Sequence, residues 1–324
     1  MSKHYLISNE GKWYKANLHS HSTDSDGALT PAQMKKAYMD KGYSVVAFSD
    51  HNVLVPHPEL TDKNFVAITA TEIDISDYRD MTVRHRPSYH LNFFAKNELC
   101  DKFVDFPKDE YKKNYSTKVI NELVKKANEA GFLAQYNHPR WSQHTTVDYV
   151  TLEGFWGFEI INGATLRNEL QGWGDIEYVT LIRNGQYPVT TASDDNHNVY
   201  PLENTAYCDS FIAFTMIKAK ELTYKGIIEA MENRDVYGTN GPIIKSLYIE
   251  DNIVHIETEP ANAIVFRTED RTTWRVLADD DSLTNAKFDL SKLTVKPKFI
   301  RFEVGNTHGQ KAMTRAYLPS EWED

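Results

Sequence analysis

Short continuous runs of apolar residues recur along most of the chain, separated by stretches with helical spacing. A run of this kind is typical of a strand that is buried on both faces of a sheet. Between the runs, apolar residues return every three or four positions, as in an amphipathic helix. This strand-then-helix order predicts an α/β fold with a largely parallel sheet. The predicted strands include residues 44–49, 65–71, 88–94, 132–136, 157–161 and 188–192.

Four of the intervening stretches have the features of helices. The first starts at Thr30, which forms a capping box with Gln33, and it ends at Gly42. The second is capped by Ser116 and ends at Gly131, and its apolar stripe belongs to the core. The other two are expected from about residue 166 to 184 and from 222 to 233.

The pattern changes after Pro242, where apolar and polar residues begin to alternate in short segments separated by turns. This alternation predicts a small antiparallel β-sandwich. A chain of 324 residues also exceeds the usual size of a single core. We therefore expect a barrel domain at 1–242 and an accessory domain at 243–324. The predicted sandwich strands are 246–250, 253–257, 263–267, 274–277, 299–304 and 311–318.

Composition narrows the classes of partner. The formal net charge is −10, which argues against a broad nucleic-acid surface or an anionic membrane as partner. The N-terminus lacks the apolar segment of a signal peptide, so a cytoplasmic protein is the simplest expectation. Its oligomeric state is not indicated. Only Cys100 and Cys208 are present, so any metal must be held by His, Asp and Glu.

The segment from Lys15 to Gly27 carries the first candidate metal ligands. His19 and His21 are two residues apart, so in a strand they point to the same side. Asp26 follows in a Ser-Asp-Gly turn that can bring its carboxylate beside the two rings. Taken alone, such a short motif more often marks a solvent-exposed strand edge than a metal site. The interpretation therefore depends on ligands from other strands.

Further polar clusters follow the ends of the other predicted strands. The carboxyl ends of parallel strands converge on one rim of a barrel. Because the candidate ligands come from so many separate strands, we favour a barrel over an open sheet, although both folds fit the strand order. A phosphate-binding glycine loop is absent, so no nucleotide cofactor is implied. The clusters are Asp50-His51-Asn52, Glu72-Ile73-Asp74, His90, Asn137-His138-Pro139-Arg140 and Asp194-Asp195-Asn196-His197.

Together these motifs resemble the PHP family, the polymerase and histidinol phosphatase metallohydrolases, over residues 14 to 242. The resemblance implies a distorted (β/α)7 TIM-like barrel, two or three divalent metal ions and, in many members, phosphoesterase activity. It also implies a ligand set for each ion. His19, His21, Glu72 and Asp195 would hold one ion, Glu72, His90 and His138 a second, and Asp26, His51 and His197 a third.

Two positions depart from the family pattern. The glycine that often precedes the family glutamate is missing in Ala70-Thr71-Glu72. The doubled aspartate leaves open whether Asp194 or Asp195 is the ligand. We expect Asp50 and Asp194 to orient ligand imidazoles.

Nitrogen and oxygen ligands without thiolate suit Zn²⁺, Mn²⁺ or Fe²⁺. Two such ions about 3.5–4 Å apart can share a hydroxide and aim it at phosphorus. Glu72, Asp195 and His197 are the candidate catalytic groups, because a leaving alkoxide needs a proton. Arg140 is a candidate phosphate clamp, with an ordinary surface ion pair as the equally weighted alternative.

The sequence leaves several functions open. The first is a metal-dependent phosphoesterase acting on a small phosphorylated molecule, and the second is a metallohydrolase of a carbon ester or amide. A non-catalytic binding protein is a weaker third. Cationic groups at the rim would favour phosphate, whereas an apolar pocket would favour a carbon ester. The segment 96–115 is interpreted as an inserted loop at this rim and a candidate lid, and Trp141 as a residue that could stack on substrate or pack the rim.

Overall fold

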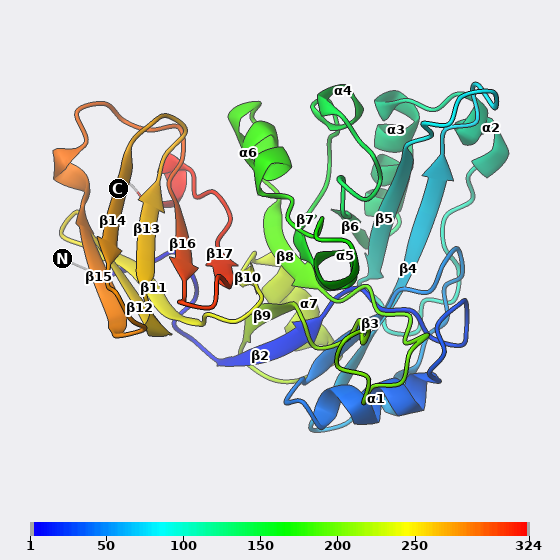
Figure 1. Ribbon diagram of the computed structural model, residues 1–324, viewed down its shortest axis with the longest axis horizontal. Coiled ribbons are helices and arrows are strands. Elements are labelled where there is room, and N and C mark those ends of the chain that lie inside the picture. The colour runs from blue at the N-terminus through cyan, green and yellow to red at the C-terminus, as the bar shows by residue number, and fades with distance from the viewer. Residues whose placement is uncertain (1–2, 323–324) are drawn as a thin grey trace.

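The computed structural model describes residues 3–322 and has a mixed α/β architecture with a large sheet and short helices (Figure 1). A thirteen-stranded sheet has the order β14-β13-β16-β17-β10-β9-β2-β3-β4-β5-β6-β7-β8, and a four-stranded sheet has the order β1-β11-β12-β15. The strands in the first part are β1 (His4–Tyr5), β2 (Lys12–Asn17), β3 (Val45–Phe48), β4 (Val66–Ser76), β5 (Ser88–Ala95), β6 (Phe132–Tyr136), β7 (Gly157–Asn162), β8 (Val189–Ser193), β9 (Phe214–Ala219) and β10 (Val236–Thr239). The helices are α1 (Pro31–Met39), α2 (Lys108–Lys113), α3 (Thr117–Glu129), α4 (Thr146–Tyr149), α5 (Gly163–Asn168), α6 (Asp175–Arg183) and α7 (Tyr224–Glu232).

The expected parallel sheet is only partly correct. Neighbouring strands are parallel from β2 to β4 and from β6 to β8. β5, however, is antiparallel to both β4 and β6, and β9 is antiparallel to β2. The physical reason for β5 is that the chain returns from β4 through residues 77–87 without a helix, and such a direct return produces antiparallel strands.

A closed barrel is not shown, because within the described residues β8 ends the ladder of the large sheet. β8 nevertheless lies against β9 and β10. The hydroxyl of Thr215 accepts a hydrogen bond from the backbone amide of Ala192 and donates one to the carbonyl oxygen of Ala192. A Cβ placed on Gly238 would lie 2.6 Å from the backbone of Thr191, so the two strands approach at backbone contact. Side-chain bonds thus hold together the region where a barrel would close.

The predicted helices are confirmed except one. The Thr30 hydroxyl accepts from the Gln33 amide to cap α1, and α3 and α7 lie within their predicted ranges. The helix expected over 166–184 is wrong as a single unit, because it is divided into α5 and α6. A Cβ on Gly172 would lie 2.2 Å from the Asn162 carbonyl oxygen, so the chain folds back tightly at this position.

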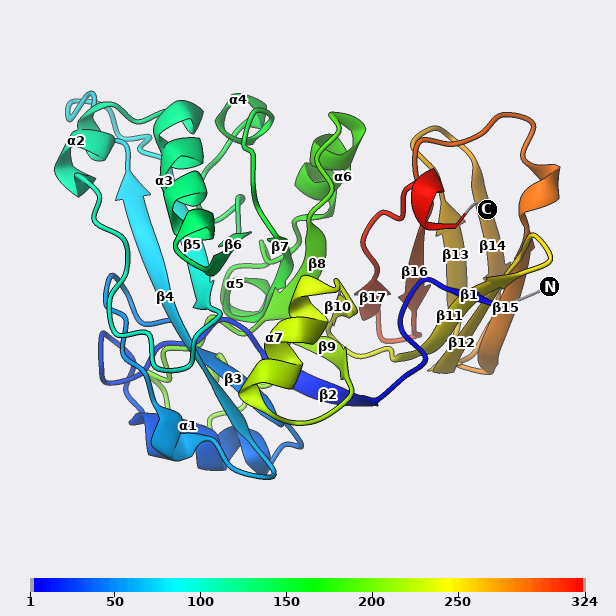
Figure 2. The same cartoon turned by 180° about the vertical axis from the view of Figure 1, so that it is seen from behind.

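The C-terminal strands form two layers that share one hydrophobic core (Figure 2, right). One layer belongs to the four-stranded sheet, which includes β1, and the other continues the large sheet through the pairing of β10 with β17. This pairing crosses the predicted boundary at residue 242, and the division into 1–242 and 243–324 stays a prediction, as does a separate β-sandwich. The strands are β11 (Ile244–Glu250), β12 (Ile253–Ala261), β13 (Ala263–Arg267), β14 (Thr273–Leu277), β15 (Leu283–Asp289), β16 (Arg301–Gly305) and β17 (Lys311–Met313).

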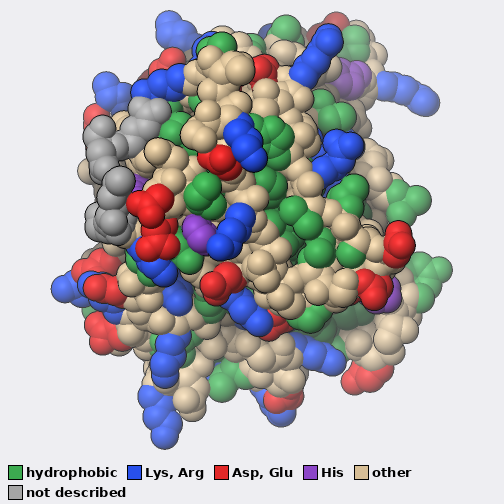
Figure 3. Space-filling view, turned by 90° about the vertical axis from the view of Figure 1, so that its left-hand side faces the viewer, with side chains coloured by type: hydrophobic (Ala, Val, Ile, Leu, Met, Phe, Trp, Pro, Cys, Tyr) green, Lys and Arg blue, Asp and Glu red, His purple; other side chains and the backbone are tan. Residues whose placement is uncertain are grey.

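The sequence analysis missed β15. Only Ala286 and Phe288 of this strand are buried, so its alternation is weak. The face built by these C-terminal strands carries acidic and basic side chains in close alternation (Figure 3). Within residues 3–322, no helix is long and apolar enough to cross a membrane.

Candidate metal centre

All nine predicted metal ligands belong to four overlapping groups of side chains, and we call these nine residues the ligand cluster. Most follow the carboxyl ends of strands: His19 and His21 come after β2, His51 after β3, and His138 after β6. Glu72 and His90 lie within β4 and β5, and Asp195 and His197 follow β8. This convergence is the one expected for strands that share a rim. The members are His19, His21, Asp26, His51, Glu72, His90, His138, Asp195 and His197.

Glu72 occupies the centre of the ligand cluster and is 1% exposed. Its Oε1 atom lies 3.2 Å from His19 Nε2, 3.1 Å from His90 Nδ1 and 3.4 Å from His138 Nε2. Its Oε2 atom lies 3.2 Å from His51 Nδ1. Burial alone would raise the pKa of Glu72, but His19 and His90 outweigh burial and hold that pKa well below its usual value. Glu72 is therefore an ionised carboxylate with imidazoles on both oxygens.

The doubled aspartate is resolved by the backbone. Asp195 has a φ of +54°, a left-handed conformation that sends consecutive side chains in different directions. Asp195 Oδ1 lies 3.1 Å from His19 Nε2 and 3.0 Å from His21 Nε2. Asp194 instead accepts from the Tyr38 hydroxyl and from the backbone amides of residues 211–213. Asp195 is thus the aspartate in the ligand cluster.

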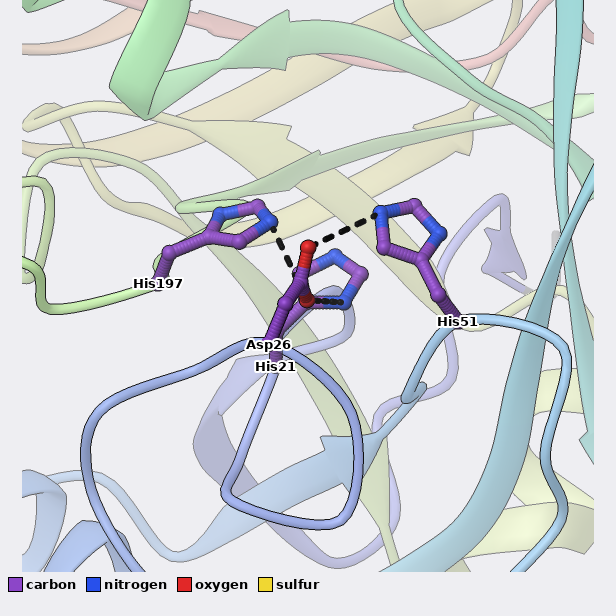
Figure 4. A group of neighbouring side chains, drawn as sticks. All are labelled: His21, Asp26, His51 and His197. Carbon is purple, nitrogen blue, oxygen red and sulfur yellow. Dashed lines mark ion pairs between the residues drawn. The ribbon is translucent and has the colours of Figure 1, made fainter.

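His21, Asp26, His51 and His197 form a more open part of the ligand cluster (Figure 4). The Asp26 carboxylate is 3.8 Å from His21 Nδ1, 3.9 Å from His51 Nε2 and 3.6 Å from His197 Nε2. These separations are too long for hydrogen bonds, yet the four groups point at a common centre. The turn that carries Asp26 closes because residue 27 is glycine: a Cβ there would lie 2.1 Å from the His21 carbonyl oxygen.

Sequence reasoning missed Glu159, which lies in the middle of β7. This carboxylate is 1% exposed and accepts from His19 Nδ1 at 3.0 Å, while the side-chain amide of Asn162 donates to its other oxygen. The bond fixes the His19 tautomer, so that Nε2 faces Glu72 and Asp195. The available signal was a charged residue inside a strand with otherwise apolar neighbours.

The ligand sets implied by the family resemblance agree with the geometry to different degrees. His19, His21, Glu72 and Asp195 come together as one group. The predicted third set, Asp26, His51 and His197, also includes His21 in the structure, so His21 belongs to two of the groups. His138 groups with His19 and Glu159, whereas His90 groups with Glu72 and His51. The assignment of ligands to individual ions stays a prediction.

The donor atoms fit divalent metal ions. Four buried atoms of the ligand cluster have no hydrogen-bond partner: His19 Nε2, His21 Nδ1, His51 Nδ1 and Glu72 Oε2. A buried polar atom without a partner costs about 1–3 kcal/mol, so four together need an explanation. Cations held between them would satisfy these atoms at once, and the nitrogen and oxygen donors match Zn²⁺, Mn²⁺ or Fe²⁺.

Two expectations about neighbouring carboxylates are corrected. Asp50 and Asp194 do not orient ligand imidazoles. Asp50 accepts from the Ser22 amide and hydroxyl and from the Ser25 hydroxyl, so it shapes the loop that carries Asp26. Burial raises the pKa of Asp194 to about 6, and this carboxylate anchors backbone instead.

The rim of the ligand cluster contains both cationic and aromatic side chains. The inserted segment 96–115 includes α2, and Lys108 of that helix lies 2.8 Å from Asp74 Oδ1, beside the strand that carries Glu72. Arg140 Nε is 3.2 Å from Glu177 Oε1, so the ion-pair alternative is observed, and its role as a phosphate clamp stays a prediction. Trp141 is 40% exposed and packs edge-on against His90 and His138.

No protein-family model and no curated protein sequence matches the chain. Among solved structures, the chain is similar to a two-domain protein from Bacteroides vulgatus that contains a predicted PHP-like metal-dependent phosphoesterase, with 15% identity, 98% and 99% of the two chains covered and a TM-score of 0.46.

Two shorter solved structures are also similar. One, from Bifidobacterium adolescentis, is described as a candidate metal-dependent phosphoesterase, with 14% identity, 59% of this chain and 89% of the other covered and a TM-score of 0.36. The other is an amidohydrolase from Chromobacterium violaceum, with 14% identity, 56% and 87% covered and a TM-score of 0.34. PHP-like proteins are thus among the structural neighbours, as the motifs predicted. The likeness is distant, with identities of 14–15%.

Proposed function

We propose that this protein is a metal-dependent phosphoesterase that hydrolyses a small phosphate ester. The observation that carries the proposal is the ligand cluster, in which five imidazoles surround the buried carboxylate of Glu72 and four donor atoms lack partners. Structural histidines are usually satisfied by hydrogen bonds, and they seldom gather around one carboxylate. A grouping of this kind is typical of a catalytic site that holds more than one divalent ion.

Charge favours a phosphate ester over a neutral substrate. Asp26, Glu72, Glu159 and Asp195 supply four negative charges, fewer than the six positive charges of three divalent ions. Loaded with three ions, the site would therefore attract an anion although the whole chain carries a net charge of −10, whereas two ions would only balance the four carboxylates. Lys108 and Arg140 also lie at the rim, where Asp74 and Glu177 offset their charges, so the excess positive charge would come from the ions. An ester of a carbon acid would gain less from this arrangement.

In the proposed reaction, different side chains have different roles. Divalent ions, when bound, would polarise the phosphoryl group and activate water. Glu72 and Asp195 hold the imidazoles at fixed separations, and Glu159 keeps His19 in one tautomer. His197 is 29% exposed in its side chain, and its Nε2 atom faces Asp26, so it would help to hold the more open ion. When no ion is held there, the imidazolium form of His197 could supply a proton to a leaving oxygen. Trp141 offers an apolar surface for the leaving group.

The proposal is tested by measuring metal content together with hydrolysis of p-nitrophenyl phosphate and p-nitrophenyl acetate. We expect two or three ions per chain and phosphate release that is lost on chelation and restored by Mn²⁺ or Zn²⁺. Changing His19 to Ala should reduce both metal content and activity, whereas Lys125→Gln on the exposed face of α3 should change neither. Activity on the acetate alone, or a chain that binds no metal, would refute the phosphoesterase.

A further inference from the structure

One face of β13, β16 and β17 carries a concentration of cationic side chains far from the ligand cluster in sequence. Arg267 on β13 and Arg301 on β16 lie directly opposite each other in an antiparallel ladder, so both point to the same side of the sheet. Glu303 is two residues beyond Arg301, and Lys311 on β17 is paired with Gly305. By the same alternation, these side chains share that side. The opposite side of the strands packs into the C-terminal core.

The charges on this face are not balanced locally. Arginines placed directly opposite each other repel, and one carboxylate lies beside both. Glu303 Oε1 is 2.7 Å from Arg301 Nη2, and its Oε2 is 2.9 Å from Arg267 Nε. Burial alone would raise the pKa of Glu303, but the two guanidinium groups outweigh burial and lower that pKa. With Lys311 also acting on Glu303, three cations face a single ionised carboxylate.

These side chains line a cavity of about 370 Å³ between the sheet and α6. Arg301 is only 4% exposed, and its Nη1 atom has no hydrogen-bond partner. Its guanidinium lies 6.0 Å from the ring centroid of Tyr178 on α6. A buried guanidinium nitrogen left without a partner is costly, so an acceptor is needed that these residues of the protein do not supply.

The other charged groups at the mouth of the cavity are already engaged. The Asp270 carboxylate accepts from the Thr268 hydroxyl and the Thr272 amide of its own turn. Asp175 lies 3.7 Å from Arg140, on the side towards the ligand cluster. Arg183 of α6 adds a further cation that lines the cavity. The lining as a whole thus carries four cationic side chains against three carboxylates.

We propose that this cavity is a binding site for a small phosphorylated molecule. The guanidinium groups of Arg267 and Arg301 can present paired N–H donors to one phosphate group, and Lys311 adds a compact positive charge. A bound phosphate would separate the two opposed arginines and give Arg301 Nη1 an acceptor. The volume leaves room for an organic portion beyond the phosphate. None of these side chains belongs to the ligand cluster, so the site is separate from the metal centre.

The test is isothermal titration calorimetry of the full-length chain with inorganic phosphate at low ionic strength, before and after removal of metal by chelation. Without ions the imidazoles of the ligand cluster could still hold an anion, so phosphate binding that survives chelation is assigned to the cavity only where the cavity variants weaken it. We expect one saturable phosphate per chelated chain. Arg267→Gln and Lys311→Gln should each weaken this binding by about tenfold, and both side chains are exposed enough for the fold to tolerate the change.

Lys125→Gln on α3 removes a cation elsewhere and should leave phosphate binding unchanged. Circular dichroism of each variant shows whether the fold is kept. Phosphate binding that disappears on chelation would place the anion at the metal centre, which would overturn the cavity proposal and leave the proposed function standing. Binding that persists unchanged in both cavity variants would equally overturn it. Binding retained without metal and lost in the two variants would support it whatever the fate of the phosphoesterase assay.

Discussion

At the residue scale, two adjacent aspartates have opposite tasks because the backbone between them turns. Asp195 faces His19 and His21, whereas Asp194 is buried against Tyr38 and the amides of residues 211–213. Removing the Asp195 carboxylate would therefore affect metal binding, and removing that of Asp194 would affect folding. The distinction depends on the positive φ at Asp195, a conformation that is uncommon in residues other than glycine and often occurs at functional sites.

Glu159 tests whether a carboxylate behind a ligand controls the site. Changing Glu159 to Gln keeps the volume but removes the charge that fixes the His19 tautomer. We expect metal affinity to fall by about 10- to 100-fold with little change in the far-ultraviolet circular dichroism. Competition with a fluorescent chelator would measure this affinity. Glu153→Gln, at an exposed position, is the matched control, and equal affinity in both variants would contradict the role.

Trp141 tests the apolar part of the rim. Its indole is 40% exposed and lies against His90 and His138, where the leaving group of an ester would pass. Replacing Trp141 by Ala should lower kcat/KM for p-nitrophenyl phosphate by about tenfold, because stacking on an aromatic ring contributes about 1–3 kcal/mol. Glycerol phosphate has no ring to stack and serves as the comparison substrate. A loss of the same size for both esters would mean that Trp141 only supports the histidines.

The grouping of the nine side chains could be predicted because histidines and carboxylates placed at strand ends leave a visible pattern, whereas their role as metal ligands stays a prediction. His19 and His21 are spaced by two residues, and His51 and His138 each follow an apolar run. Glu159 left no such pattern, since its partner His19 is 140 residues away in the sequence. The hydrogen-bonding roles of Asp50 and Asp194 could not be predicted either, because their partners are backbone amides and hydroxyls that only the folded chain brings close.

At the element scale, the first turn of α6 controls Arg140 through Glu177 and Asp175. If Arg140 binds the substrate phosphate, Glu177 competes for the same guanidinium. Changing Glu177 to Gln should then lower KM for a phosphate ester several-fold, whereas Arg140→Gln should raise KM by about tenfold. Steady-state kinetics on the metal-loaded protein measures both. Should KM stay constant in the two variants, Arg140 is a structural partner of α6.

The existence of most elements could be predicted, but their direction and continuity could not. The apolar run of β5 is the same whether the strand runs parallel or antiparallel to β4, and only the missing helix in residues 77–87 decides. The helical pattern over 166–184 hid a break, because the close contact of Gly172 with the Asn162 carbonyl depends on β7. Local patterns indicate what each segment forms, whereas long-range packing decides how segments connect.

At the scale of the whole molecule, the strands from β2 to β10 and the C-terminal strands share their hydrophobic cores. Leu6, Ile7 and Tyr237 from the first part are buried in the core of the C-terminal layers. In return, Phe299 and Met313 are buried in the core beside β5 and β6. The hydrophobic pattern changes at Pro242, but side chains from before this residue help to fill the C-terminal core, and side chains from after it help to fill the core beside β5 and β6.

This exchange predicts the behaviour of a chain that ends at residue 242. Such a fragment would expose the edge of β10, which pairs with β17 in the full chain, and unpaired edges favour aggregation. Each large apolar side chain that loses its burial costs about 1.5–3 kcal/mol, and several are lost against a typical total stability of about 5–15 kcal/mol. We therefore expect the fragment to be insoluble or unfolded, as judged by its soluble fraction and thermal unfolding. A soluble fragment with the metal content of the full chain would show that 1–242 folds alone, and the shared cores would then stabilise the contact between two parts without being needed for the metal centre.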